Sequence, residues 1–170
     1  MNLRAKVNKI IFPVVEFISH CFPDYGWGIR LRGLLIQPFL KSCGKDLKIN
    51  IGAHIYNPNG LTVRDHVYIG FHSYIGNGEI TIEDEVVIGP FCSITGGNHT
   101  QKDGSIRFGE YEYKPTRIGK GSWLAAHCCI MPGVIVAECN IIAAGAVVTE
   151  DTKPYAMYAG IPAKKIKNLR

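Results

Sequence analysis

The sequence lacks an apolar run long enough to cross a bilayer, a block of like charges and a paired-cysteine metal motif. Pro13 and Glu16 interrupt the apolar stretch at residues 10–22, whereas a membrane-crossing helix needs about 20 apolar residues in succession. No small-residue cleavage site follows that stretch, so we expect no signal peptide. The net charge of +5 is scattered rather than gathered with aromatic residues, so we expect no nucleic-acid partner. These absences favour a cytoplasmic protein, and a length of 170 residues with 46% hydrophobic content favours a single domain.

A repeat of six residues dominates the second half of the chain. Aliphatic residues recur at every sixth position, at Ile118, Leu124, Ile130, Val136, Ile142 and Val148. Small or compact residues follow four positions later, at Ser122, Cys128, Val134, Asn140 and Ala146. This period fits neither a helix nor a simple alternating strand, but it fits short strands joined by tight corners. Three such strands make one triangular coil of roughly eighteen residues, so the repeat predicts a parallel β-helix, an all-β solenoid.

The same pattern continues towards the N-terminus. Two earlier runs have the same spacing, at Val63, Ile69 and Ile75 and at Ile82, Ile88 and Ile94. One extra residue separates the runs, which predicts a bulged corner near Gly78. We expect Ile51 and Asn57 to extend the first run, with the coil beginning near Leu47 and Asn57 standing at an otherwise apolar position. Cys92 and Cys128 fall in small inward positions, where cysteine acts as a compact apolar residue, and we expect a reducing compartment.

This pattern resembles the hexapeptide-repeat acyltransferases. Residues 45–168 are similar to maltose and galactoside O-acetyltransferases and to colanic acid, capsule and O-antigen O-acetyltransferases, in Gly96-Gly97-Asn98-His99, in GSWLAA and in the closing AGIPAK segment. The resemblance implies a left-handed coil, a homotrimer, acetyl-CoA as acyl donor with no metal, and a sugar or nucleotide-sugar acceptor. It therefore implies an acetyl-CoA-dependent O-acetyltransferase, and an N-acetyltransferase of a nucleotide-linked amino sugar is the alternative.

The chain divides into three predicted parts. Residues 1–45 form a helical cap on the open end of the coil, residues 46–152 form the β-helix with a protruding loop at 96–117, and residues 153–170 form a tail with a short helix. Within the cap, residues 29–41 have helical spacing that Pro38 should shorten. The first helix either packs against its own trimer or lies on a membrane surface as a peripheral contact.

His99 is the predicted catalytic residue. Imidazole can take a proton from a hydroxyl or amine at neutral pH, and the resemblance implies that His99 is the general base for direct transfer, without an acyl-enzyme. The alternative is an ordinary exposed loop histidine. We expect an acidic partner to orient it, with Glu83, Glu85 and Asp103 as unranked candidates.

The resemblance also implies where the acyl donor binds. The matching positions are Trp123, Ala126, Ala144, Thr149, Lys164 and Lys167. Small residues permit a close backbone approach, although β-helix corners favour them regardless. The lysines offer cations for coenzyme phosphates but also simply suit a basic terminal helix. Glu150 stands where relatives often have lysine, which weakens a phosphate contact there.

Acceptor contacts are predicted in the segment IYNPNG. Tyr56, Asn57 and Asn59 resemble the Tyr/Asn-rich segment that contacts sugar hydroxyls in the maltose and galactoside enzymes. Asn57 could equally be a structural residue of the coil. The loop aromatics Phe108, Tyr111 and Tyr113 could stack on a ring or only tether the loop.

The remaining histidines test a rival assignment as a zinc enzyme. They occur at corner or outward positions, at His54, His66, His72 and His127. His54 and His72 are eighteen residues apart, so we expect them to stack on one edge. The close-spaced histidine pair of zinc β-helices is not reproduced, so we expect no metal. A scaffold without enzymatic activity remains the other alternative.

Overall fold

Three faces of short parallel strands form the body of the molecule. The computed structural model describes residues 3–170, and the first two residues of the predicted cap lie outside them. The first sheet contains β1 (Ser42–Cys43), β4 (Leu61–Val63), β7 (Ile80–Ile82), β12 (Thr116–Ile118) and β15 (Ile135–Val136). The second contains β2 (Lys48–Ile49), β5 (Tyr68–Ile69), β8 (Val87–Ile88), β13 (Trp123–Leu124), β16 (Ile141–Ile142), β18 (Ala156–Ala159) and β19 (Lys164–Asn168). The third contains β3 (His54–Ile55), β6 (Tyr74–Ile75), β9 (Ser93–Ile94), β14 (Cys129–Ile130) and β17 (Val147–Val148).

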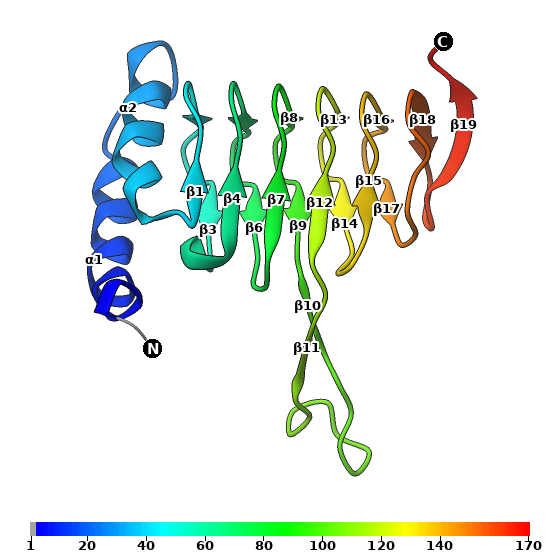
Figure 1. The fold of residues 1–170 in the computed structure, drawn as a ribbon, viewed down its shortest axis with the longest axis horizontal. Coiled ribbons are helices and arrows are strands. Elements are labelled where there is room, and N and C mark those ends of the chain that lie inside the picture. The colour runs from blue at the N-terminus through cyan, green and yellow to red at the C-terminus, as the bar shows by residue number, and fades with distance from the viewer. Residues whose placement is uncertain (1–2) are drawn as a thin grey trace.

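The coils stack side by side into a parallel β-solenoid, which confirms the predicted fold class (Figure 1). Each coil passes from the first sheet to the second and then to the third. The repeat's aliphatic residues fill the interior, so that Ile88, Leu124 and Ile142 have no solvent exposure. Cys92 and Cys128 are also buried, as predicted. Burying these side chains in a continuous column is what holds adjacent coils together.

The register of the first coil differs from the prediction. Ile49 and Ile55, rather than Ile51 and Asn57, point inward, and they pair with Ile69 and Ile75 of the next coil. The 3-10 turn η2 (Pro58–Gly60) lengthens this coil and shifts the spacing. For the same reason His54 does not stack on His72. His54 lies instead beside Tyr74, with ring centroids 5.9 Å apart.

The loop expected at residues 96–117 is an antiparallel hairpin. Its strands are β10 (Gly97–His99) and β11 (Tyr111–Tyr113), and His99 pairs with Tyr111. The hairpin leaves the solenoid at the corner between the third and first sheets, because it connects β9 to β12. Figure 1 shows it projecting well clear of the coils.

Two helices close the N-terminal end of the solenoid (Figure 1). They are α1 (Leu3–Ser19) and α2 (Trp27–Ile36), followed by the 3-10 turn η1 (Gln37–Phe39). Pro38 lies in that turn, and the α-helix ends two residues before it, so the predicted shortening is confirmed. No helix within residues 3–170 is both long and apolar enough to cross a membrane.

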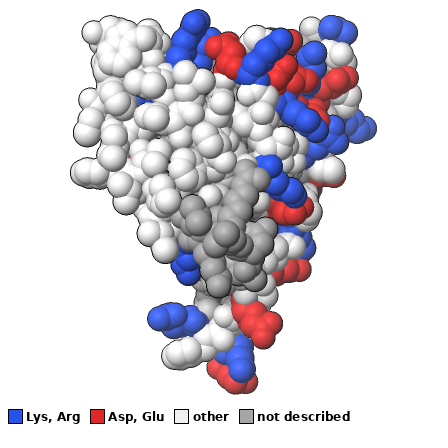
Figure 2. Space-filling view, turned by 60° about the vertical axis from the view of Figure 1, so that its left-hand side comes forward, with Lys and Arg blue, Asp and Glu red and all other residues white. Residues whose placement is uncertain are grey.

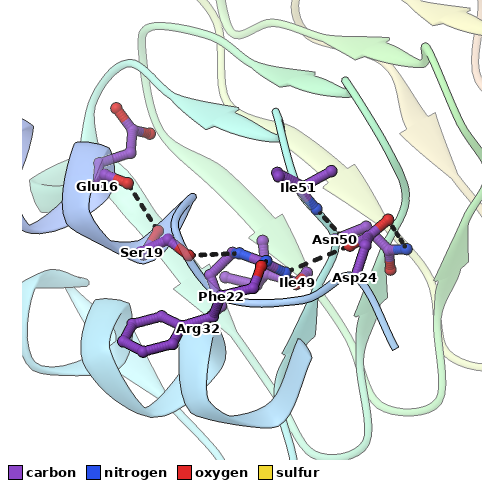
Figure 3. A network of polar contacts seen from close by, with 8 residues as sticks. All are labelled: Glu16, Ser19, Phe22, Asp24, Arg32, Ile49, Asn50 and Ile51. Atoms are coloured by element: carbon purple, nitrogen blue, oxygen red, sulfur yellow. Dashed lines mark hydrogen bonds and ion pairs between the residues drawn. The ribbon is translucent and has the colours of Figure 1, made fainter. Parts of the chain in front are cut away.

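A buried arginine ties the cap to the first coil (Figure 3). Arg32 donates to the backbone carbonyls of Ser19, Phe22 and Ile49, and its Nη1 lies 3.4 Å from Asp24 Oδ1. Asp24 in turn accepts a hydrogen bond from the amide of Ile51. These contacts join α1, α2 and β2, because one side chain reaches all three.

The predicted C-terminal helix is wrong. Residues 164–168 form β19, which pairs antiparallel with β18 at the far end of the second sheet. A strand here has a physical reason, because β18 would otherwise present an unpaired edge. The lysines of this segment, with Lys165 between Lys164 and Lys167, therefore lie along a strand rather than around a helix.

Candidate active site

The predicted acceptor residues and His99 share one edge of the solenoid. This edge is the corner between the third and first sheets, where Asn57 follows β3, Asn77 follows β6 and the hairpin follows β9. The corners here are irregular, with the turn η2 and the hairpin in place of tight bends. The edge therefore offers a row of side chains and backbone groups that the regular corners do not.

Tyr56, Asn57 and Asn59 line a cavity of about 390 Å³ at this edge. Helix α1 supplies the opposite wall through Asn8 and Phe12 among others. Asn8 Nδ2 donates to Asn59 Oδ1 at 2.8 Å, which fixes one amide of the lining. The structure thus brings the three predicted acceptor residues together, and amide groups are suitable partners for the hydroxyls of a sugar.

Asn57 is partly structural. Its side-chain amide donates to the carbonyl of Gly78 in the next coil at 3.3 Å. It also lines the cavity, so both predicted roles fit this residue.

Asn77 was not predicted from the sequence. It lines the same cavity and an adjoining depression that also contacts Tyr113. Its Nδ2 donates to Tyr113 Oη at 2.9 Å, so Tyr113 tethers the hairpin to the solenoid. The sequence signal that could have revealed Asn77 was its position at the predicted bulged corner, immediately before Gly78.

A row of aromatic rings connects this cavity to His99. The rings of Tyr113 and Tyr111 are stacked with centroids 5.9 Å apart, and Tyr111 lies 4.2 Å from the ring of His99. Burial, with smaller effects of Tyr56 and Tyr111, raises the pKa of Tyr74 above its usual range. Tyr74 therefore stays a neutral phenol at physiological pH.

None of the three expected acidic partners orients His99. Glu83 accepts hydrogen bonds from Arg117, and Glu85 lies 3.7 Å from Lys120, both at the corner between the first and second sheets. Asp103 lies farther out along the hairpin. Within the part of the chain that the structure describes, the imidazole of His99 makes a ring contact but no hydrogen bond.

The predicted donor residues fall in three places. Trp123 lies half-exposed on the outer face of the second sheet, in one cross-strand row with Ile141, Met157 and Lys167. Ala126 and Ala144 occupy stacked positions at the corner between the second and third sheets. Thr149 follows β17 at the edge that carries the hairpin. The single chain therefore does not gather the six residues into one pocket.

The donor positions nevertheless fit a thioester coenzyme. The backbone N–H groups of Ala126 and Ala144 donate no hydrogen bond to the described residues, although the carbonyl of Ala126 accepts one from Gly145. Such outward N–H groups beside small side chains can bind an extended amide-containing arm. The ammonium group of Lys164 lies 3.6 Å from the carboxylate of Glu150, which stands where a lysine was expected from the resemblance. Glu150 therefore partly neutralises Lys164, one of the predicted phosphate ligands.

No cluster of three potential metal ligands occurs within the described residues. Instead, His72 and His127 flank Phe91 in a stack, with ring centroids 5.7 and 5.0 Å from it. All three occupy left-handed corner positions with φ between 52° and 61°. His127 directly follows Ala126 at this corner, and the imidazoles of the stack contact the ring of Phe91 rather than one another.

Comparisons with known proteins agree with this geometry. Residues 115–150 match the family model described as bacterial transferase hexapeptide (six repeats). A galactoside O-acetyltransferase of Escherichia coli is 25% identical over 142 residues, which are 83% of this chain and 70% of the relative. A chloramphenicol acetyltransferase of Agrobacterium fabrum is 28% identical over 150 residues, covering 70% of this chain and 72% of the relative.

Two solved structures show the same fold. A hexapeptide-repeat acetyltransferase from Vibrio cholerae superposes with a TM-score of 0.83 at 20% identity, covering 99% of this chain and 94% of that one. That enzyme has also been solved with acetyl coenzyme A. A variant of an N-acyltransferase from Bacillus cereus, in complex with dTDP-4-amino-4,6-dideoxyglucose and coenzyme A, has a TM-score of 0.65 at 19% identity, covering 77% and 84%.

The six-residue repeat and the stacked three-sided coils define a hexapeptide-repeat β-solenoid. Residues 115–150 of this coil match the model of bacterial hexapeptide transferases, and the relatives by sequence named above are acetyltransferases.

Proposed function

We propose that this protein is an acetyl-CoA-dependent O-acetyltransferase that acts on a sugar hydroxyl of a surface-polysaccharide precursor. The observation that carries the proposal is the continuous row from the amide-lined cavity through Tyr113 and Tyr111 to His99. This row supports the proposal because it links a residue able to accept a proton to a cavity whose lining suits a polyhydroxylated acceptor, both at one edge of the solenoid.

In this mechanism His99 takes the proton of the attacking hydroxyl. Tyr111 limits the positions of the imidazole by ring contact, and Asn77 with Asn59 orients the acceptor by hydrogen bonding. The N–H groups of Ala126 and Ala144 would hold the donor's arm, and Lys167 would meet its phosphates. Acetyl-CoA supplies the activated acetyl group when bound. The proton held by His99 can then pass to the departing thiolate, so the histidine returns to its starting state.

We further propose that the working site lies between copies in a homotrimer. His99 stands on a hairpin that projects away from the coils, whereas Trp123 lies on the outer face of the second sheet. Two neighbouring copies packed with parallel axes could bring the hairpin of one against the second sheet of the other. This arrangement would complete a site that the single chain leaves divided.

Mixing two inactive variants tests this arrangement. His99→Ala and Trp123→Ala should each lose activity on their own, by about a hundredfold or more for His99. Co-expressed in equal amounts, they should restore activity, because about a quarter of the interfaces in random trimers would combine one intact His99 with one intact Trp123. A site built from one chain would give no restoration.

The second candidate function is N-acetylation of a nucleotide-linked amino sugar. It is favoured by the shared fold with the Bacillus cereus N-acyltransferase, whose structure contains a dTDP-amino sugar. Incubation with labelled acetyl-CoA and a pool of sugars, nucleotide sugars and amino sugars would separate the two. A product that loses its label in mild alkali is an ester and supports O-acetylation, whereas an alkali-stable product is an amide.

A further inference from the structure

Helix α1 has its polar and apolar sides reversed relative to an ordinary surface helix. Of the polar residues from position 8 to its end, three are buried against the solenoid, namely Asn8, Glu16 and Ser19. Glu16 accepts hydrogen bonds from the amide of Ile55 and contacts His54 at 2.9 Å. An ordinary surface helix would turn such residues towards water.

The opposite side of α1 is apolar and uncovered. It exposes five large apolar side chains, at Ile10, Ile11, Val14, Phe17 and Ile18. Ile10 and Phe17 are each 74% exposed. At 100° per residue these five fall within about a third of the helix circumference, directly opposite the buried polar residues. We call this set the outer stripe.

Residues 8–40 of the cap expose cations, whereas their two acidic residues have partners in the interior. Residues 8–40 contain two acidic residues, and both are turned inward, Glu16 towards β3 and Asp24 towards Arg32 and the amide of Ile51. Lys9 and Arg30 are exposed. Figure 2 shows a broad face almost without acidic residues over the cap, with charges gathered at its margins. Tyr25 and Trp27, in and after the turn that follows α1, are also exposed, as aromatic residues at a lipid–water boundary commonly are.

We propose that the outer stripe docks the protein on an anionic lipid surface, with α1 lying in the plane of the headgroups. Apolar residues on one side and cations beside them are the features by which an interfacial helix binds such a surface. Contact with a second copy through the same stripe is disfavoured by charge. It would bring Lys9 of both copies to one seam, and both acidic residues of positions 8–40 already have partners in the interior, whereas the exposed Asp46 lies beside Arg30.

Docking would also place the candidate acceptor cavity at the lipid surface. Lys9 belongs to both features, because it lies beside the outer stripe and lines the cavity. An acceptor sugar presented from a membrane would then reach the amide lining without leaving the surface.

Vesicle flotation tests the proposal independently of acetyl transfer. The purified protein is mixed with vesicles of phosphatidylcholine alone or with about one third phosphatidylglycerol. The expected result is binding to the anionic vesicles that weakens with salt, and a fall in the bound fraction of about tenfold or more in Ile10→Ser/Phe17→Ser. The matched control is Ile161→Ser, which removes an equally exposed apolar side chain near the opposite end of the chain and should leave binding unchanged.

Two results would overturn the proposal. One is absence of vesicle binding by the unaltered protein, or equal binding by the double variant. The other is a smaller oligomer mass for the double variant in analytical ultracentrifugation, which would show that the stripe joins copies of the chain. Unchanged thermal unfolding of the solenoid confirms that the variants are folded, and because flotation requires no catalysis, its outcome is separate from that of the proposed enzymatic function.

Discussion

Replacing Arg32 should release the helical cap from the solenoid. Its guanidinium has no solvent exposure and satisfies the carbonyls of Ser19, Phe22 and Ile49 (Figure 3). Burial lowers the pKa of Arg32, and the nearby Asp24 partly offsets that effect. Arg32→Met keeps much of the side-chain volume but removes the guanidinium from the three carbonyls and from Asp24, which retains its hydrogen bonds from Ile51 and Asn50. Breaking a buried charged contact of this kind costs about 3–5 kcal/mol.

Hydrogen exchange measures this loss where it occurs. A change of 3–5 kcal/mol corresponds to an increase of roughly a hundred- to several-thousand-fold in the opening equilibrium of the cap, read from the amides of α2 at fixed protein concentration. Arg30→Met is the control, since Arg30 lies on the same helix but is exposed, and its change should stay within about 0.5 kcal/mol. Equal protection of α2 in the two variants would refute the view that Arg32 holds the cap in place.

Three further predictions follow from the site and the core. Burial, with a smaller effect of a neighbouring thiol, raises the pKa of Cys129, so less of its thiolate is present at pH 8. Alkylation of Cys129, measured by peptide mapping, should therefore be slower than alkylation of the exposed Cys21 and should become faster as the pH rises. Glu150→Gln should free Lys164 and tighten coenzyme binding about two- to fivefold at low salt, by calorimetry, with little effect at high salt. Asn77→Ala should raise the KM for the acceptor about two- to tenfold while the KM for acetyl-CoA stays constant. A raised KM for acetyl-CoA with a constant KM for the acceptor would contradict a role of Asn77 in acceptor binding.

The repeat was predictable from the sequence because the interior of a solenoid repeats its environment. Each coil has the same inward positions, so Ile118, Leu124 and Ile130 are all fully buried, and their spacing alone predicts the fold. The register failed in the first coil for a local reason. Pro58–Gly60 form a 3-10 turn that lengthens the coil without an obvious break in the aliphatic pattern, so the spacing predicts Ile51 as the inward residue where the structure has Ile49.

The ends of the chain were harder to predict for a different reason. A basic segment such as residues 164–168 has no periodic pattern, and its strand conformation is imposed by the open edge of β18. Asn77 was missed because its role depends on α1, more than fifty residues away, which supplies the facing wall of the cavity. The resemblance grouped Tyr56, Asn57 and Asn59 as one predicted acceptor segment, and these residues, which are close in the chain, line one cavity.

The central claim is tested most directly by an acetyl-transfer assay. Labelled acetyl-CoA is incubated with a pool of sugars and nucleotide sugars, and the unaltered protein and His99→Ala are compared side by side. We predict an acetylated, alkali-labile sugar product with the unaltered protein and a loss of about a hundredfold or more in the variant, with coenzyme binding retained. A variant with undiminished rate would contradict the role of His99, and a protein with neither product nor affinity for the coenzyme would contradict the proposed activity as a whole.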